Sequence, residues 1–292
     1  MLVEHTTAMS SKDFESFKSS IVEKLRHDAL VLPTPPNVAM RVQKALNDNP
    51  DINADELSSL IQTDTALSIG IMKVANTVYI SKASKPKSLS QAVARIGLNR
   101  IRSLVFKLAM EQMFISNDKF AALKLKKTWE SSLDVAAFSL ALRTTHPNKK
   151  IFRSIDADVL TLISISHQIG LLPVYVELSS GNFDTSDKSF VLRCEMKLNS
   201  ALTKKILTSW GMDEDIIQGS SGWMHLNPWG SIAKYSDIIR LATLEKNCFW
   251  VSKENKQVLL NTAVDKGLIP DASFFTKSEF SQKYSEIRSA LS

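Results

Sequence analysis

Residues 88–109, which read SLSQAVARIGLNRIRSLVFKLA, contain the signals of two consecutive helices. Ser88 and Gln91 have the spacing of a capping box, in which each side chain binds a free backbone N–H at the start of a helix. Gly97 fits the end of that helix, because glycine tolerates the left-handed backbone of a C-cap. Apolar residues then recur at helical spacing, at positions 101, 104, 105, 108 and 109. The stretch therefore predicts two short helices that follow one another directly.

The rest of the chain carries the same helical signals. The prolines at 33, 35 and 36 separate a helix at 13–29 from one that begins at residue 36 or 37. Asn53, Asp64 and Thr276 are N-cap candidates for other helices. Longer helical patterns cover 118–144, 155–178, 188–209, 213–222, 230–246 and 254–265. No convincing run alternates like a strand, so we predict an all-α protein.

The composition is ordinary for a soluble globular protein, with 292 residues, 44% hydrophobic and 23% charged. Nine glycines and nine prolines are too few for a disordered chain, a collagen or a turn-dense β-sandwich. Two cysteines cannot form a disulfide framework, which favours a reduced, intracellular setting. The N-terminus lacks a secretory pattern, and charged or polar residues interrupt the apolar stretch at 157–176. We therefore expect a cytoplasmic protein that does not bind membranes.

The net charge of +6 arises in one part of the sequence. Residues 65–110, the basic window, contain eight lysines and arginines and no acidic residue, whereas the other 28 basic residues are outnumbered by 30 acidic ones. Such a window is typical of a docking surface for an anionic partner. The candidate docking residues are Lys82, Lys85, Lys87, Arg95, Arg100 and Arg102.

A solvated face, balanced by acidic residues at 48–56 folded nearby, is the alternative interpretation of the basic window. Tyr79 is its only aromatic residue before Val105, whereas single-strand binders interleave basic and aromatic residues. The sequence also has no recognition-helix or zinc-finger motif. A nucleic-acid partner is therefore disfavoured, and an anionic ligand at this window stays an open alternative.

Common catalytic motifs are absent from the sequence, including both phosphate-binding glycine loops, HExxH and any Cys/His cluster with zinc spacing. Four segments in order nevertheless match a known family: LPTPPNVA (32–39), IQTDTALS (61–68), VANTVY (74–79) and SLSQAVARIGLNRIR (88–102). Looser matches at Trp129, 166–170 and Trp210 extend the similarity to about residue 226. On these segments the chain resembles the HDOD family.

The resemblance implies a multi-helical HD-like bundle with a C-terminal helical extension. We accordingly divide the chain into an N-terminal tail (1–20), an HDOD domain (21–226) and the extension (227–292). Within the HDOD domain we expect an N-terminal helical layer up to about residue 115 and an HD-like helical core after it. The resemblance also implies a regulatory role in bacterial signal transduction.

HDOD domains are similar to the HD superfamily of metal-dependent phosphohydrolases, in which an adjacent His-Asp pair holds a divalent metal that activates water. In this sequence the pair reads His167-Gln168, and a neutral amide cannot offset the charge of a dication. The other ligand positions of the family pattern fall at Ser131, Asn199, Trp223, Met224 and Thr243. His225 could supply one ligand only through a one-residue shift.

We therefore predict no catalytic residue, no metal site and no cofactor, and interpret Ser131, His167, Gln168 and Asn199 as vestigial positions. His167 is then a core-helix histidine bonded to a neighbour, with a residual metal or ligand role as the alternative. The predicted function is a non-catalytic signal-transduction scaffold with an unidentified protein partner. One alternative is a metal-dependent phosphohydrolase or phosphodiesterase, and another is an anion or nucleic-acid binder acting through the basic window.

Overall fold

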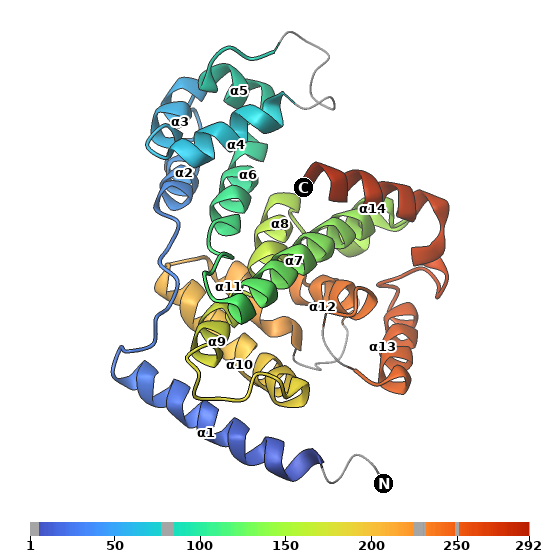
Figure 1. The fold of residues 1–292 in the computed structure, drawn as a ribbon. Helices are drawn as coiled ribbons and strands as arrows, with labels where there is room; N and C mark the ends of the chain where they lie inside the picture. Colours follow the sequence, from blue (N-terminus) through green and yellow to red (C-terminus); the bar gives the residue numbers. More distant parts are fainter. Residues whose placement is uncertain (1–5, 77–84, 225–229, 231, 249–250, 292) are drawn as a thin grey trace. The chain divides into compact units, whose positions relative to one another are not determined.

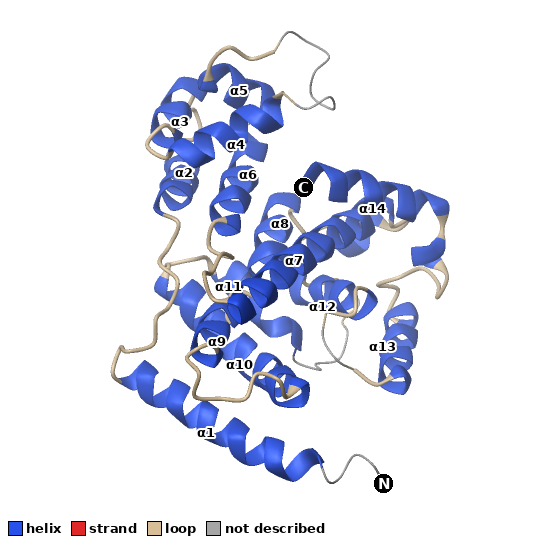
Figure 2. Ribbon diagram, in the orientation of Figure 1, coloured by secondary structure: helices blue, strands red, loops and turns tan. Residues whose placement is uncertain are grey.

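The computed structural model describes residues 6–76, 85–224, 230, 232–248 and 251–291, and all regular secondary structure in these ranges is helical (Figure 2). The predicted all-α fold is confirmed. The chain divides into two compact units. We call residues 34–113 the small unit, and residues 1–33 together with 114–292 the large unit (Figure 1).

The small unit contains α2 (Asn37–Asp48), α3 (Ala54–Ile61), α4 (Thr65–Ala75), α5 (Leu89–Ile96) and α6 (Leu98–Glu111). Its helices begin where the sequence predicts, because Asn53, Asp64 and Ser88 each accept a backbone N–H two or three residues ahead. Gly97 has a φ of +90° and both ends α5 and begins α6. The apolar faces enclose a core that includes Val42, Leu57, Ile71, Val93 and Ile101.

The large unit is built around α7 (Lys119–Thr145), which packs against α8 (Ala157–Ser166), α9 (Leu171–Leu178), α12 (Tyr235–Glu245) and α14 (Ser278–Leu291). The other α-helices are α1 (Thr6–Arg26), α10 (Lys188–Ser209), α11 (Glu214–Ser221) and α13 (Lys253–Asp265). Short 3₁₀ turns lie at η1 (Lys149–Phe152), η2 (Gly222–Met224) and η3 (Phe274–Thr276). Figure 1 shows α7 crossing the middle of this unit.

Helix α1 begins at residue 6, so most of the segment assigned to an N-terminal tail is helical in the structure. Its buried face carries Phe14, Phe17 and Ile21, and the helix packs against α10. The Phe17 ring meets Phe183 and Phe190 edge-on. Tertiary burial of these rings, rather than the polar composition of the first residues, therefore decides the structure of this segment.

The apolar stretch from α8 to α9 is a core segment, as the sequence predicts. Ala157–Leu178 is long and apolar enough to cross a membrane, yet 89% of its most apolar window is buried inside the protein. A turn through His167 and Gln168 separates the two helices. A Cβ atom at Gly170 would lie 2.6 Å from the backbone N of Thr203, so only glycine allows this turn to approach α10 so closely.

The segment assigned to a C-terminal extension belongs to the large unit. Helix α14 packs along α7, and the Phe138 ring of α7 lies 4.7 Å from the Phe275 ring and 5.0 Å from the Phe280 ring, centroid to centroid. Phe138 and Phe280 are buried. Aromatic packing therefore joins the end of the chain to the helix that also carries Ser131.

Candidate functional site

A cavity of about 640 Å³ lies in the large unit beside the turn between α8 and α9. Helices α7, α9 and α10, the turn η2 and residues within 246–248 and 251–256 form its wall. Ser131, Gln168 and Asn199 all line this cavity, although they are far apart in the sequence. Three of the four positions singled out from the sequence are thus brought together.

His167, the fourth position, is completely buried. Its Nδ1 lies 2.6 Å from the carbonyl oxygen of Ser164, and its ring packs edge-on against Trp223 with the centroids 5.4 Å apart. A carbonyl oxygen only accepts, so Nδ1 carries the proton and Nε2 is left as an acceptor without a partner among the described residues. Burial lowers the pKa of His167 to about 4, so the ring is neutral at pH 7.

Gln168 is 6% exposed and is one of the residues that line the cavity. Its Oε1 atom is buried and has no hydrogen-bond partner among the described residues. A buried acceptor without a partner loses the hydrogen bonds that water would supply. The cavity wall therefore contains an unsatisfied acceptor at the position where the HD pattern has a carboxylate.

Asn199 is a structural residue that ties α10 to the turn after α8. Its Nδ2 donates to the carbonyl oxygen of His167 at 3.0 Å, and its Oδ1 accepts from Thr203 Oγ1 at 3.1 Å. Thr203 Oγ1 in turn accepts from the N–H of Gly170 at 3.0 Å. Both ends of the Asn199 amide are thus occupied by protein groups, and this network fixes the orientation of the His167-Gln168 pair.

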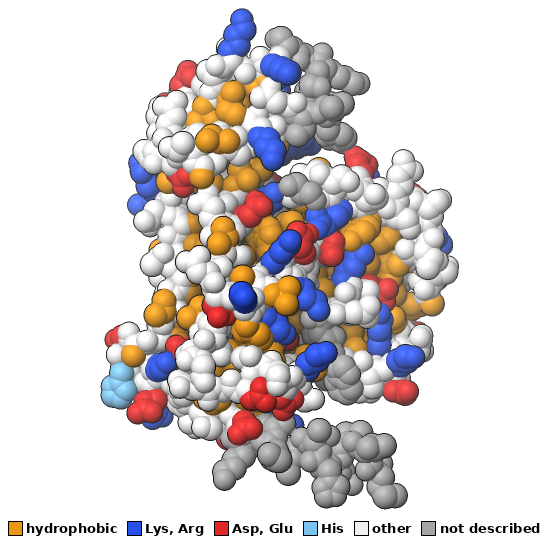
Figure 3. Space-filling model, viewed as in Figure 1, with side chains coloured by type: hydrophobic (Ala, Val, Ile, Leu, Met, Phe, Trp, Pro, Cys, Tyr) orange, Lys and Arg blue, Asp and Glu red, His pale blue; other side chains and the backbone are white. Residues whose placement is uncertain are grey.

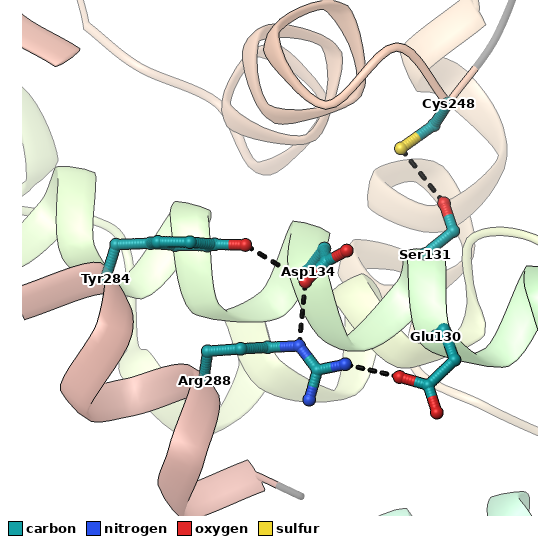
Figure 4. A network of polar contacts seen from close by, with 6 residues as sticks. All are labelled: Glu130, Ser131, Asp134, Cys248, Tyr284 and Arg288. Atoms are coloured by element: carbon teal, nitrogen blue, oxygen red, sulfur yellow. Dashed lines mark hydrogen bonds and ion pairs between the residues drawn. The ribbon is translucent and has the colours of Figure 1, made fainter. Parts of the chain in front are cut away.

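Ser131 contacts a cysteine and no charged group. Its Oγ donates to Cys248 Sγ at 3.0 Å (Figure 4). Burial raises the pKa of the Cys248 thiol to about 11, so the sulfur stays protonated at neutral pH. The hydrogen-bonded pair of Ser131 and Cys248 therefore carries no charge.

The carboxylates of the cavity wall are held by groups of the chain itself. Arg288 of α14 pairs with both Glu130 and Asp134 of α7, and Tyr284 Oη donates to Asp134 at 3.0 Å (Figure 4). On the opposite side, Glu195 pairs with Lys124 at 2.8 Å and accepts a hydrogen bond from Tyr175 Oη at 3.0 Å. All three carboxylates of the wall are thus bound by groups of the chain before any ligand binds.

Five lysines also line the cavity: Lys124, Lys127, Lys246, Lys253 and Lys256. Lys246 Nζ lies 3.5 Å from the centroid of the Tyr284 ring, and burial lowers its pKa. In Figure 3 basic side chains lie among acidic and apolar ones on the visible face of the large unit. The sequence analysis missed these lysines because they come from separate segments and no local pattern links them.

The remaining HD-pattern positions are occupied by packing groups. Trp223 is 1% exposed, and its backbone carbonyl accepts from Arg240 Nε at 3.0 Å. Thr243 is completely buried and donates to the carbonyl oxygen of Arg240 at 2.9 Å. His225 lies outside the described residues. A tryptophan and an arginine therefore build this wall.

A divalent metal does not fit this set of residues. The described residues contain no group of three or more histidines, cysteines or acidic residues that could hold a metal ion. The carboxylates of the wall are paired with cations, and the amide of Asn199 is bound at both ends. Gln168 Oε1 and His167 Nε2 are too few ligands for a coordination sphere.

The basic window lies in the small unit. Lys85, Lys87 and Arg100 are exposed, Arg95 and Arg102 are half-buried, and Lys82 lies outside the described residues. These residues precede α5 or lie on α5 and α6, two helices that pack together. Lys107, also in the window, is buried and pairs with Glu111 at 3.7 Å. Three of the six candidate docking residues are thus exposed to solvent.

Solved structures with a similar fold come from several bacteria. The structure has a TM-score of 0.82 and 29% identity to a protein from Shewanella amazonensis SB2B provisionally named a metal-dependent phosphohydrolase, and the match covers 96% of this chain and 100% of that one. An HDOD domain protein of unknown function from Geobacter sulfurreducens gives a TM-score of 0.65 at 18% identity, with 96% and 97% covered. A protein from Marinobacter aquaeolei VT8, provisionally named a signal transduction protein, gives 0.61 at 16% identity, with 96% and 66% covered.

Sequence comparison agrees with these structures. A curated protein of Treponema pallidum (strain Nichols), itself uncharacterised, is 25% identical over 111 residues, which span 38% of this chain and 21% of that protein. The chain thus matches only about a fifth of that relative. The family model for the HDOD domain matches residues 32–221, which is well over half of the chain. The chain belongs to the HDOD domain family.

Proposed function

We propose that this chain is a non-catalytic HDOD module of a bacterial signal-transduction system, acting in the cytoplasm through a protein partner. The observation that carries this proposal is the wall of the cavity beside His167. Gln168 stands at the position of the acidic HD ligand, and the chain's own cations and hydroxyl groups bind the carboxylates of the wall. A scaffold role agrees with the name of the Marinobacter relative.

A metal-dependent phosphohydrolase is the competing function, and the name of the Shewanella relative raises it. It needs a ligand set that binds a dication and activates water. We expect full-length protein purified without chelator to carry well below one metal ion per chain. Hydrolysis of bis(p-nitrophenyl) phosphate should be the same for wild type, His167→Ala and the exposed-site control His27→Ala. Stoichiometric metal with turnover that His167→Ala abolishes would disprove the proposal.

The exposed lysines and arginine of the basic window are the proposed contact surface for the partner. An anionic protein surface would be attracted by Lys85, Lys87 and Arg100, which have no ion pair among the described residues. The test is affinity capture from the native cytoplasm with three forms of the full chain: wild type, a triple Glu variant at these positions, and a control triple Glu variant at Lys188, Lys204 and Lys205.

The triple variant in the window should lose the partner that wild type and the control both retain. If all three forms capture the same proteins equally, this surface is not the contact site. A captured nucleic acid whose affinity falls steeply with salt would instead support the nucleic-acid alternative.

A further inference from the structure

We infer that the cavity beside His167-Gln168 binds a small organic anion with an apolar body, held by lysine side chains and by Gln168 without a metal ion. This inference goes beyond the proposed function, because it concerns a small-molecule site and would stand even without a protein partner. The cavity has a volume of about 640 Å³, which is within the range of roughly 300–1,000 Å³ typical of small-molecule sites.

The positive charge of the lysines in the cavity wall favours an anionic ligand. Five lysines face three carboxylates, Glu130, Asp134 and Glu195, each of which already binds Arg288 or Lys124. Lys127 and Lys253 line the cavity and have no ion pair among the described residues. Their charge is therefore uncompensated in the structure, and a ligand of opposite charge would be attracted to it.

Gln168 favours a ligand that carries a hydrogen-bond donor. Gln168 lines the cavity, and its Oε1 atom is buried, lacks a hydrogen-bond partner among the described residues and would have to rotate toward the cavity to meet a ligand. A ligand with an N–H or O–H group near its apolar body would satisfy this acceptor. A ligand that cannot donate would leave it unpaired, which costs binding free energy.

Apolar side chains form a further part of the wall. They are Leu171, Leu192, Met196, Trp223, Met224 and Val251. Such a lining favours an aliphatic or aromatic body over a free inorganic ion. Methionines in particular adapt to irregular shapes. The three requirements together describe an organic anion that carries a hydrogen-bond donor.

Part of this cavity lies outside the region that the family model matches. Lys246, Lys253 and Lys256 follow residue 221, where that match ends, and so do Cys248 and Val251. Three of the five cavity lysines therefore come from the C-terminal part of this chain. The lysines of the site therefore lie outside the HD ligand positions, whereas Gln168 occupies one of them.

A matched pair of fluorescent dyes tests the inference on the full-length chain. 1-Anilinonaphthalene-8-sulfonate carries an anion, an aromatic body and an N–H donor, whereas N-phenyl-1-naphthylamine lacks only the sulfonate. The Lys127→Gln/Lys253→Gln variant changes two exposed residues. We expect it to weaken binding of the sulfonate dye about tenfold and to leave binding of the neutral dye unchanged. The control Lys204→Gln/Lys205→Gln, also exposed and in the large unit, should bind both dyes like wild type.

Two further measurements complete the test. Gln168→Leu should weaken the binding of both dyes, because both carry the N–H donor. Circular dichroism verifies that this variant is folded. 4-(Hydroxymethyl)phenyl phosphate, 4-(hydroxymethyl)benzoate and benzyl alcohol, which all carry an O–H donor, then compete with the sulfonate dye at millimolar concentration. Stronger displacement by either anion than by benzyl alcohol supports the inference and identifies the preferred anionic group.

Equal displacement by neutral benzyl alcohol would overturn the inference, and so would unchanged affinity in the Lys127→Gln/Lys253→Gln variant. Neither result would affect the metal and capture experiments on the proposed function, so the two failures are distinguishable.

Discussion

The small unit and the large unit are both helical, but they are specified in different ways. In the small unit, three of the five helix starts have a side-chain cap: Asn53, Asp64 and Ser88 bind backbone N–H groups within three residues of their own position. In the large unit, the cavity joins side chains from residue 124 to residue 256. Local signals therefore explain the first unit, whereas only long-range packing explains the site in the second.

Both units contain side chains that cap helices by binding free backbone N–H groups, and in the large unit Asp118, Asp156, Asp187 and Ser252 do so. The large unit adds polar contacts between distant helices, as in the contacts of Asn199 with His167 and of Arg288 with Asp134. The difference between the units therefore lies in these long-range contacts and not in the caps.

The largest expected effect comes from two glycines, one in each unit. A Cβ at Gly170 would clash with the backbone of α10, at Thr203 N, and backbone atoms cannot move away cheaply. A Cβ at Gly70 would meet Leu108 Cδ1 at 2.8 Å, the flexible end of a side chain. We expect Gly170→Ala to cost about 3 kcal/mol of unfolding free energy and Gly70→Ala less than about 1 kcal/mol. Urea unfolding of both variants measures this, and equal losses would contradict the comparison.

The second effect is a pH dependence that only the large unit should show. The pKa of His167 is about 4 in the folded chain, below the ordinary 6.5, so the unfolded chain binds a proton first as the pH falls. The contribution of the buried neutral ring to the free energy of unfolding is fully present above pH 6.5 and is lost as the pH falls toward 4. The free energy of unfolding should therefore fall by about 2 kcal/mol between pH 7 and pH 5.

Unfolding free energies at pH 7 and pH 5 test this for wild type, His167→Gln and His27→Gln, which replaces an exposed histidine. The difference between the unfolding free energies at pH 7 and pH 5 should shrink by about 2 kcal/mol in His167→Gln and persist in His27→Gln. An unchanged pH dependence in His167→Gln would show that this ring is not held neutral by burial.

A third, smaller effect concerns the local caps of the small unit. Asn53 Oδ1 accepts from the N–H of Asp55 and of Glu56, both at 3.0 Å. Asn53→Ala should cost about 1 kcal/mol, whereas Asn53→Gly should cost only a few tenths, because glycine is tolerated at an N-cap. Thermal unfolding ranks the two variants, and a larger loss for glycine would contradict a capping role.

The smallest effect is expected at the contact of α14 with the cavity. Tyr284 Oη donates to Asp134, which Arg288 also binds, so Tyr284→Phe removes one hydrogen bond and keeps the ring. We expect a loss of about 0.5–1 kcal/mol in urea unfolding. Tyr284→Phe in an Arg288→Gln background should cost a different amount if the two side chains act as one network. Strict additivity would show that they act independently.

Much of the fold can be predicted from the sequence, because caps and apolar spacing act over a few residues. The helices at 37–48, 89–96 and 188–209 follow from such signals. The helix predicted at 13–29 begins earlier, at residue 6, and packs on α10 through Phe17 and Phe190, a contact that local patterns do not reveal. Tertiary packing also explains why the helical pattern at 155–178 forms two helices in the structure. The turn between them packs on α10, a contact that the pattern does not reveal.

The sequence by itself determined the all-helical class, the family, and the glutamine at the position of the acidic HD ligand. Each of these depends on residue identity or on spacing within one segment. Only the tertiary structure decided that Lys127 and Lys253 line the same cavity as Gln168, and that Arg288 binds the carboxylates of α7. The physical reason is that charge compensation and burial act through space, between side chains whose separation along the chain carries no signal.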